Sequence, residues 1–207
     1  YDRDRIAVAA GKPVEILFEN TDLMPHNLVV TRPGALEEIG TRSEAEAAQP
    51  DALERHYVPR SDQVLVSCRL LQPAQSQRLA FTAPTAAGVY PYVCTYPGHW
   101  RRMFGALYVV EDLEAFLADE EGYLARSSLP VTDELLKVRG PRTAWKFEDL
   151  ASSLAELDRG RSYANAREMF RVASCIACHR VDGAGNEFGP DLTRLDPQRG
   201  RADILRD

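Results

Sequence analysis

Two short segments of the chain carry side chains that bind soft transition metals. The segment 92–103 contains Cys94, followed by His99 five residues later and by Met103 after four more. A further histidine, His26, lies far upstream. Two imidazoles, one thiolate and a weak axial thioether form the ligand set of type 1 (blue) copper sites, and the soft thioether favours copper over zinc. The sequence therefore predicts one mononuclear type 1 copper site. Its expected ligands are His26, Cys94, His99 and Met103.

The spacing of these residues fits one shared metal. Cys94 follows a β-rich run, so a strand would fix the direction of its thiolate, and the turn at Pro97-Gly98 would bring the later ligands back to the same place. A cysteine or a methionine taken alone is more often an ordinary core residue. Their combination with a distant histidine in a β-rich context is what favours a metal site.

A second motif, Cys175-Ile176-Ala177-Cys178-His179, has the C-x-x-C-H spacing of a c-type haem attachment site. In such a site the two cysteines are joined to the haem and the histidine is the proximal iron ligand. A C-x-x-C pair could also be a redox dithiol or half of a zinc site, and the adjacent histidine favours haem. The sequence thus predicts one covalently bound haem c. Its expected attachment residues are Cys175, Cys178 and His179.

Residues 1–110, which contain the predicted copper ligands, have the pattern of an all-β domain. Short β-rich runs alternate with turn sequences that contain Gly, Pro, Asn and Asp. About seven strands at this spacing predict a mainly β fold, a Greek-key β-sandwich. The expected strands are 6–8, 14–18, 28–30, 64–66, 79–81, 89–93 and 106–110. Residues 35–56 are rich in Ala and Glu and are expected to form a helical insertion between two strands.

The remainder of the chain is expected to be helical. Apolar residues recur with a helical period in 113–124 and 150–157, which predicts a linker of two or three short helices over 111–160. Residues 161–207 would begin with a helix at 163–172 and carry the haem motif. All three methionines of the chain precede that motif, so the sixth haem ligand is expected outside the chain. The last region is therefore expected to be the N-terminal part of a truncated cytochrome c domain in a longer polypeptide.

Residues 1–110 resemble the cupredoxins, the family of blue copper proteins. The run Cys-Thr-Tyr-Pro-Gly-His at 94–99, with Met103 four residues on, is similar to the loop of the azurin and auracyanin type. The run Pro-His-Asn at 25–27 is closer to that of plastocyanin. The resemblance implies that the two histidines and the cysteine are the strong ligands and that Met103 is the axial ligand.

The same resemblance implies roles for residues around the ligands. Asn27 would tie the two ligand loops together, and nearby backbone amides would donate hydrogen bonds to the Cys94 sulfur. Azurins have a glycine before the first histidine, and that glycine supplies a carbonyl oxygen to copper. Because Pro25 occupies this place here, a fifth ligand is not expected.

Residues 161–207 resemble class I cytochromes c in the segment that follows the haem motif. The segment Gly-Pro-Asp-Leu at 189–192 comes ten residues after His179, and in cytochromes c such a segment packs against the proximal histidine. The longer run at 178–193 is more similar to the haem-binding domain of large planctomycete and verrucomicrobial redox proteins.

The composition limits the classes of partner. A formal net charge of −6 and a pI near 5.3 argue against nucleic acid or an anionic membrane surface. No stretch approaches the roughly 18 uninterrupted apolar residues of a membrane span. No acid–base pair, nucleophile or open metal position is evident, so we expect an electron carrier that works with redox partner proteins and is not itself an enzyme.

Two other functions stay open at this point. The chain could be the electron-accepting segment of a larger dehydrogenase whose catalytic domain lies upstream, or a copper-binding or storage module without a redox role. In the resembling families both cofactors are loaded outside the cytoplasmic membrane, which implies a periplasmic or cell-surface location.

Four further residues are weaker candidates. Trp100 and Phe104 flank His99 and are interpreted either as an apolar surface through which the electron leaves or as simple packing. Cys68 has no histidine nearby in the sequence and is expected to be a buried or free thiol. His56 lies at the end of the charged insertion and is expected to be exposed to solvent.

Overall fold

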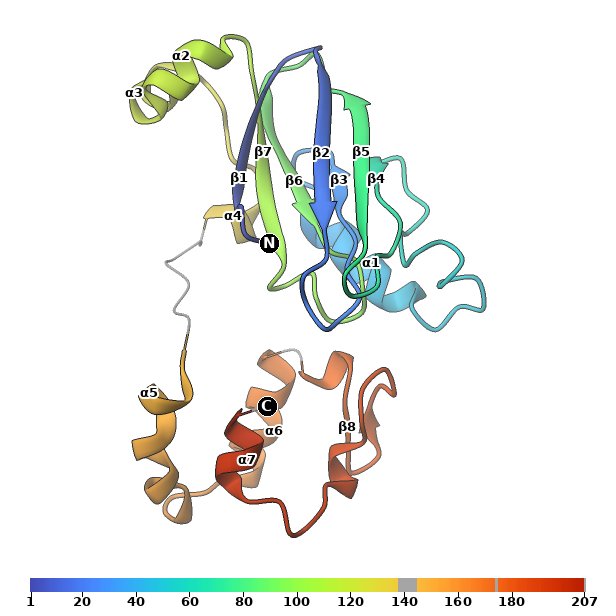
Figure 1. Cartoon of the computed structure of the whole chain (residues 1–207), viewed down its shortest axis with the longest axis vertical. Coiled ribbons are helices and arrows are strands. Elements are labelled where there is room, and N and C mark those ends of the chain that lie inside the picture. Colours follow the sequence, from blue (N-terminus) through green and yellow to red (C-terminus); the bar gives the residue numbers. More distant parts are fainter. Residues whose placement is uncertain (138–144, 174, 207) are drawn as a thin grey trace. The chain divides into compact units, whose positions relative to one another are not determined.

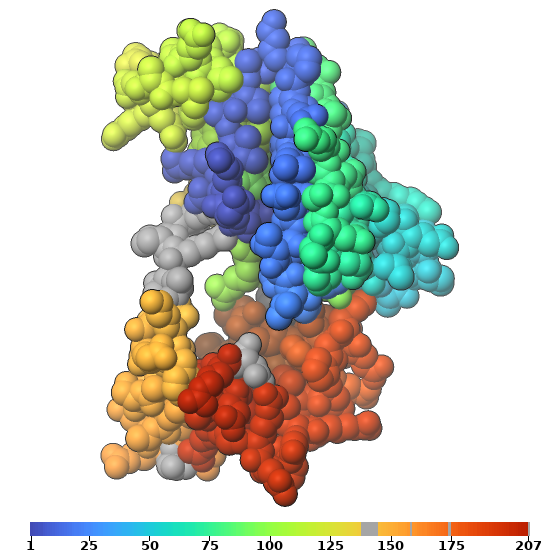
Figure 2. All heavy atoms as spheres, in the orientation of Figure 1, coloured from blue at the N-terminus to red at the C-terminus, as the bar shows by residue number. Residues whose placement is uncertain are grey.

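The computed structural model describes residues 1–137, 145–173 and 175–206 of the chain. These residues belong to two compact units, Tyr1–Arg139 and Gly140–Asp207, which are drawn as ribbons in Figure 1 and as spheres in Figure 2. Within the described residues, no helix is both long enough and apolar enough to cross a membrane.

Two β-sheets form the framework of the first unit (Figure 1). The larger sheet is mixed and has the strand order β1-β7-β6-β3-β4, in which β1 and β7 are parallel and the other neighbours are antiparallel. Its strands are β1 (Arg5–Ala9), β3 (Val29–Thr31), β4 (Val64–Ser67), β6 (Gly88–Val93) and β7 (Phe104–Val110). The smaller sheet pairs β2 (Pro13–Glu19) with β5 (Ser76–Thr82) in antiparallel fashion. The two sheets form a β-sandwich.

The main core lies between these two sheets. Alternate residues of each strand point inward, as the period of two requires. Phe18 and Leu79 of the smaller sheet belong to the same buried cluster as Tyr90, Leu107 and Val109 of the larger sheet. This cluster joins the two sheets into one unit.

Strands β6 and β7 are buried on both faces, which explains their uninterrupted apolar sequences. Leu107 points into the core between the sheets, whereas Phe104 points to the opposite face. Helices cover that opposite face: α1 (Leu36–Glu46) over one part, and α2 (Leu113–Ala118) with α3 (Glu120–Arg126) over another. The helices that lie between and after the strands in the sequence therefore pack on the outer face of the larger sheet.

The seven predicted strands and the β-sandwich are confirmed, with strand ends that differ from the prediction by at most three residues. The insertion predicted at 35–56 is helical only in its first half, because α1 ends at Glu46 and turns follow it. Pro50 explains this end, since a proline cannot continue a helix through the preceding turn. In Figure 2 the residues after α1, coloured cyan, form a bulge on the side of the sandwich.

Residues 111–137, expected as the first part of a linker, pack on the sandwich. Phe116 of α2 is buried against Tyr108 of β7, and Leu136 of α4 (Glu134–Lys137) contacts two of the buried clusters. Asp133, also buried, accepts hydrogen bonds from the backbone N–H groups of Gly34 and Leu36 at the start of α1. The first unit therefore extends beyond the last strand.

The second unit is mostly helical. Its elements are α5 (Phe147–Ala151), α6 (Tyr163–Val172), α7 (Arg201–Arg206), the 3-10 helices η1 (Ser152–Asp158), η2 (Cys175–Ala177) and η3 (Leu192–Arg194), and the short strand pair β8 (Arg180–Val181) and β9 (Ala184–Gly185). The helix predicted at 163–172 is confirmed. No described side chain of this unit is fully buried, so the unit has no apolar core comparable to that of the sandwich.

Candidate metal centre

Three of the four predicted copper ligands lie together in the structure. The Cys94 Sγ atom lies 3.8 Å from His26 Nδ1 and 3.7 Å from His99 Nδ1, and the two Nδ1 atoms are 3.1 Å apart. Cys94 and His26 are buried, and His99 is half-buried. In the part of the chain that the structure describes, no other group of three His, Cys, Asp or Glu side chains comes so close together.

The triangle formed by these three atoms fits a metal ion. A point equidistant from the three atoms lies roughly 2.1 Å from each, within the range of about 2.0–2.3 Å for metal–nitrogen and metal–sulfur bonds in protein sites. One thiolate and two imidazoles also suit copper in their softness. The residues present therefore fit a copper ion bound between them.

Backbone hydrogen bonds hold the ligands in place. Cys94 directly follows β6, and its N–H donates to the Met103 carbonyl at 2.9 Å. Within the intervening loop, the Met103 N–H donates to the His99 carbonyl at 2.7 Å. His26 exchanges two backbone hydrogen bonds with Leu71 just before β3. Because β3 and β6 are paired neighbours, the two ligand segments enter the site from adjacent strands.

Met103, the predicted axial ligand, lies at the end of the same loop, immediately before β7. Its side chain is half-buried and packs against the main core. Together with His26 it lines a cavity of about 370 Å³. The fourth predicted ligand thus shares a cavity with one of the other three.

Asn27 ties the two ligand segments together, as the sequence predicted. Its side-chain oxygen accepts a hydrogen bond from the Thr95 N–H at 2.8 Å, and its amide nitrogen donates to the Thr95 hydroxyl at 2.8 Å. The same nitrogen donates to the His56 carbonyl at 2.7 Å. Since Asn27 follows His26 and Thr95 follows Cys94, this buried bridge sets the spacing of the two ligands.

The Cys94 sulfur is shielded from water. Burial raises the pKa of its thiol to about 12, and hydrogen bonds from the backbone of Asn27 and Tyr96 oppose part of that rise. Without metal the thiol keeps its proton at neutral pH, and binding a metal as thiolate releases that proton.

The imidazole of His99 is neutral at physiological pH. Burial, and to a smaller extent the neighbouring His26 ring, lowers the pKa of His99 to about 4. A neutral ring has a nitrogen lone pair that can bind a metal without first losing a proton.

The flap, which we define as residues 35–58, reaches over the ligand loop. The Tyr57 ring lies edge-on to the Tyr96 ring at 5.4 Å, and the Tyr96 ring lies 5.0 Å from that of His99. His56 and Tyr57 have φ angles of 56° and 59°, which non-glycine residues rarely adopt. His56 was expected to be exposed, but it is half-buried because this turn brings its carbonyl to the site.

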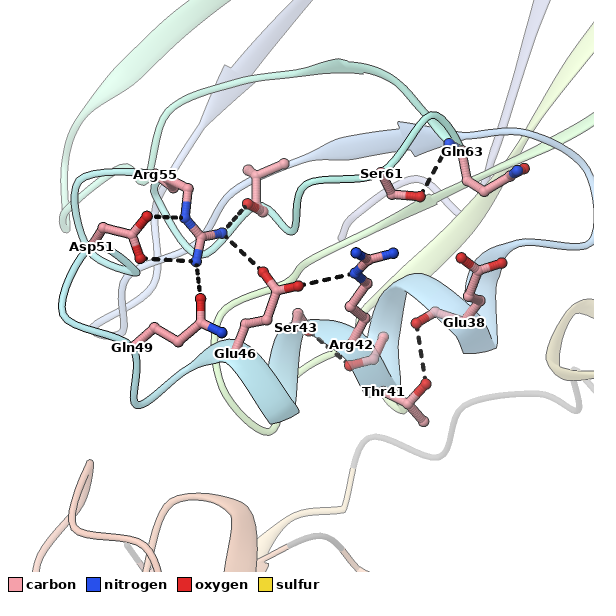
Figure 3. Close-up of polar contacts among 12 residues, drawn as sticks. Glu38, Thr41, Arg42, Ser43, Glu46, Gln49, Asp51, Arg55, Ser61 and Gln63 are labelled. Carbon is pink, nitrogen blue, oxygen red and sulfur yellow. Dashed lines mark hydrogen bonds and ion pairs between the residues drawn. The ribbon is translucent and has the colours of Figure 1, made fainter.

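Figure 3 shows how the flap keeps its own shape. The guanidinium of Arg55 donates hydrogen bonds to the side chains of Asp51, Gln49 and Glu46. Arg42 of α1 donates a further hydrogen bond to Glu46 at 2.9 Å. These contacts link α1 to the turns that follow it, so the flap is one connected element.

Trp100 and Phe104 do not form an exposed surface beside His99. They are 4% and 7% exposed, respectively, and pack with Leu36 and Ile39 of α1. Of the two interpretations, packing is confirmed, because α1 covers the face of the sheet to which both rings point.

Asp22 belongs to the site although its sequence context indicated only a turn. Its carboxylate oxygen Oδ2 lies 3.0 Å from His26 Nε2. Hydrogen bonds from His26 and from the Leu23 N–H lower the pKa of the Asp22 carboxyl. The only signal in the sequence was an acidic residue four positions before a predicted ligand.

The residues predicted to hold haem lie in the second unit. Cys175 and Cys178 are half-buried and are not in a disulfide. His179 Nδ1 lies 2.9 Å from the Pro190 carbonyl, which can only accept, so Nδ1 carries the proton and the Nε2 lone pair is left for a ligand. Gly189 lies so close to the His179 ring that an added Cβ would be 2.7 Å from it. Gly189 and Pro190 of the 189–192 segment therefore both contact His179.

An apolar cavity lies beside this motif. Its volume is about 470 Å³, and it is lined on one side by α6 and on the other by Ile176, between the two cysteines, and Val181. Tyr163, Met169 and Val172 of α6 are more than half exposed. The charged residues Arg167, Glu168 and Arg171 of α6 also border this cavity.

The first unit has relatives among known proteins. Residues 1–110 match the family described as copper binding proteins of the plastocyanin/azurin family. Auracyanin-A of Chloroflexus aurantiacus is 32% identical over 111 residues, which are 53% of this chain and 66% of that protein. The match thus spans just under two thirds of the length of this curated relative.

Two solved structures are similar as well. The reduced auracyanin from the photosynthetic bacterium Roseiflexus castenholzii is 28% identical, with a TM-score of 0.47 over 53% of this chain and 86% of that one. Auracyanin A of Chloroflexus aurantiacus, described as a "blue" copper protein, is 31% identical, with a TM-score of 0.47 over 53% of this chain and 87% of that one.

The family match covers more than half of the chain and includes the sandwich and the His–Cys–His triangle. Cupredoxins are electron carriers rather than enzymes, and their redox centre is copper. The chain therefore belongs, through residues 1–110, to the plastocyanin/azurin family of copper-binding electron-transfer proteins, the cupredoxins.

Proposed function

We propose that the first unit transfers single electrons through a type 1 copper site. His26, Cys94 and His99 are the strong ligands in this proposal, and Met103 is the axial ligand. The observation that carries it is the triangle of one sulfur and two imidazole nitrogens, with edges of 3.1, 3.7 and 3.8 Å. When bound there, copper supplies a one-electron couple between Cu(I) and Cu(II).

The protein holds the ligand residues in fixed positions through hydrogen bonds. The Asn27 bridge and the hydrogen bond between the Cys94 N–H and the Met103 carbonyl hold the ligand segments at a fixed spacing. Burial keeps water away from the Cys94 sulfur. His99 is the most exposed of the three strong ligands, so it is the expected point at which an electron enters or leaves.

The first test is the visible spectrum of the copper-loaded full chain beside that of Cys94→Ser. A Cu(II)–thiolate bond absorbs strongly in the visible region, so we expect an intense band that is lost in the variant. Cys68→Ala is the matched control, because it removes the other buried thiol of the same unit and should keep the band. A folded, copper-loaded protein without this band would contradict the proposal and favour copper storage.

We further propose that the second unit binds one c-type haem through Cys175, Cys178 and His179. The hydrogen bond between His179 Nδ1 and the Pro190 carbonyl supports this, because it orients the ring and leaves Nε2 for iron. Two one-electron centres on one chain would be at high effective concentration for each other.

Haem attachment can be tested in cells that produce c-type cytochromes. After denaturation, we expect the full chain to retain a haem mass and a haem-stained band, and Cys175→Ser/Cys178→Ser to lose both. A chain that shows the blue copper spectrum but carries no covalent haem would contradict this part of the proposal alone.

The same assignment implies a compartment and partners. We place the protein in the periplasm or at the cell surface, where both cofactors are installed in the resembling families, and expect redox proteins as its partners. Fractionation of the producing cells tests this, and recovery of the loaded protein from the cytoplasm would contradict it.

A further inference from the structure

The His26 ring has two nitrogens with different neighbours. Nδ1 faces the Cys94 sulfur and His99 Nδ1, whereas Nε2 faces the Asp22 carboxylate at 3.0 Å. An ionised carboxylate can only accept hydrogen bonds, so Nε2 must be the donor. In a neutral ring the lone pair is then on Nδ1, the atom that points to the other ligands.

The carboxylate is held in place by a small network. The Asp22 N–H donates to the Asn20 side-chain oxygen at 3.0 Å, and the Leu23 N–H donates to the Asp22 carboxylate at 2.6 Å. The Asn20 amide nitrogen, which is buried, donates to the carbonyls of Met24 and Leu71 at 2.8 and 2.9 Å. Leu71 is also the backbone partner of His26. One buried asparagine thus fixes both the carboxylate and the strand segment opposite the histidine.

We propose that Asp22 is a positioning residue of the metal centre, which holds the His26 ring with Nδ1 toward the metal and favours the higher oxidation state. This inference rests on the copper site proposed above. A carboxylate bound to the far nitrogen of a ligating histidine fixes its tautomer and makes the ring a stronger donor. Its negative charge also stabilises Cu(II) more than Cu(I), because Cu(II) carries one more positive charge.

The exposure of the Asp22 and His26 side chains determines how strongly Asp22 should change the binding of Cu(II). The Asp22 side chain is 61% exposed, whereas that of His26 is only 8% exposed. Water screens part of the carboxylate charge, but the hydrogen bond itself ends on a buried ring. We therefore expect an effect at the lower end of the range of about 10–100-fold that is typical for partners of metal-ligating histidines.

The first experiment compares reduction potentials of the copper-loaded full chain and Asp22→Asn. Asparagine keeps an acceptor but loses the charge, so we expect Cu(II) to be bound up to about tenfold less tightly relative to Cu(I). A tenfold change corresponds to a rise in potential of about 59 mV for a one-electron couple. The matched control is Asp2→Asn, which removes a charge from the wall of the same cavity without removing a carboxylate from His26. Equal potentials for the two variants would overturn the electrostatic role.

The second experiment needs no copper. Nitrogen-15 chemical shifts of the His26 ring in the metal-free, neutral-ring state report which nitrogen carries the proton. We expect the Nε2-protonated tautomer in the unmodified chain and in Asp22→Asn, and a mixture of tautomers in Asp22→Ala. A proton on Nδ1 in the unmodified chain would overturn the positioning role.

The two experiments also separate this inference from the proposed function. If the unmodified, copper-loaded chain lacks the blue absorption, the copper proposal fails, and the ring shifts still report whether Asp22 orients His26. If the absorption is present but Asp22→Asn behaves like Asp2→Asn and Asp22→Ala keeps one tautomer, the role of Asp22 fails alone.

Discussion

Cys68 and Cys94 are both buried thiols of the first unit, but their neighbours give them different chemistry. Two histidine nitrogens lie within 3.8 Å of the Cys94 sulfur. Cys68 is 2% exposed, and its sulfur accepts a hydrogen bond from the Leu28 N–H at 2.9 Å. Burial raises the pKa of the Cys68 thiol from 9.0 to about 11. Cys68 is therefore the buried thiol that the sequence predicted, and it stays neutral at physiological pH.

Cys68 should make folding stability depend on pH in the alkaline range. Burial disfavours the Cys68 thiolate only in the folded state. The neutral thiol therefore makes its full contribution to the free energy of unfolding below pH 9, and this contribution is lost as pH rises from 9 to about 11. At about 1.4 kcal/mol per pKa unit, the loss is at most about 3 kcal/mol. Urea unfolding of Cys94→Ser and Cys94→Ser/Cys68→Ala measures it, because neither chain contains the Cys94 thiol. We expect the double variant to lose less stability over this range, and equal losses would contradict the prediction.

At the scale of single residues, the sequence predicted what residue type and spacing decide. Cys94, His99 and His26 could be recognised because few arrangements use these side chains together. Asp22 could not be recognised as a partner of His26, because the contact depends on the path of a loop with no periodic pattern. The same holds for Tyr57, which reaches the site through two consecutive residues with positive φ.

Helix α1 packs both on the loop that carries His99 and on the face of the larger sheet that points away from the main core. Trp100, which follows His99, packs against α1, and Arg101 forms an ion pair with Glu44 of the same helix. The close approach requires a glycine, since a Cβ at position 40 would overlap the indole ring of Trp100. The position of α1 and the position of His99 are therefore coupled.

Gly40→Ala should destabilise the first unit although alanine is the better helix former. The gain in helix propensity is about 1 kcal/mol. Overpacking against a buried ring costs typically about 1–3 kcal/mol, so we expect a net loss, together with a shift of the visible copper band. Thermal unfolding and the visible spectrum measure both effects. Thr41→Ala, at the next position on the exposed face, is the control: it should keep the visible band and, from helix propensity alone, should not lower the stability. A Gly40→Ala chain at least as stable as the unmodified chain, with the same visible band, would contradict the prediction.

Among the elements, the positions of the strands could be predicted from the sequence. The helices that cover the strands and the pairing of β1 with β7 could not. Apolar runs between turn sequences located all seven strands of the sandwich, because each run must bury at least one face. The uninterrupted runs of β6 and β7 are buried on both faces, but their sequence does not identify α1 and α2 as the covering elements. The parallel pairing of β1 with β7 joins residues about a hundred positions apart, and no local pattern reports it.

At the scale of the whole molecule, the two units are stabilised in different ways. The first has three buried apolar clusters around the larger sheet. In the second, the described side chains are at most half-buried, and apolar residues of α6 such as Tyr163 and Met169 face outward. The family match and the metal triangle belong to the first unit. The haem motif was recognised from five consecutive residues, and it remains a proposal because a short motif does not determine the cofactor around which it folds.

The parallel pairing of β1 and β7 has a mechanical consequence. Arg5 is aligned with Ala106 and Ala9 with Val110, so the start of β1 and the end of β7 lie at opposite ends of the pair. Tension applied between these two points would act along the strands and load all of their hydrogen bonds together. The antiparallel pair β6 and β7, pulled at its two open ends, would instead release its hydrogen bonds one after another. Force applied at these two points would therefore load the pair in its more resistant geometry and leave the metal-binding loop, which lies between β6 and β7, outside the line of force.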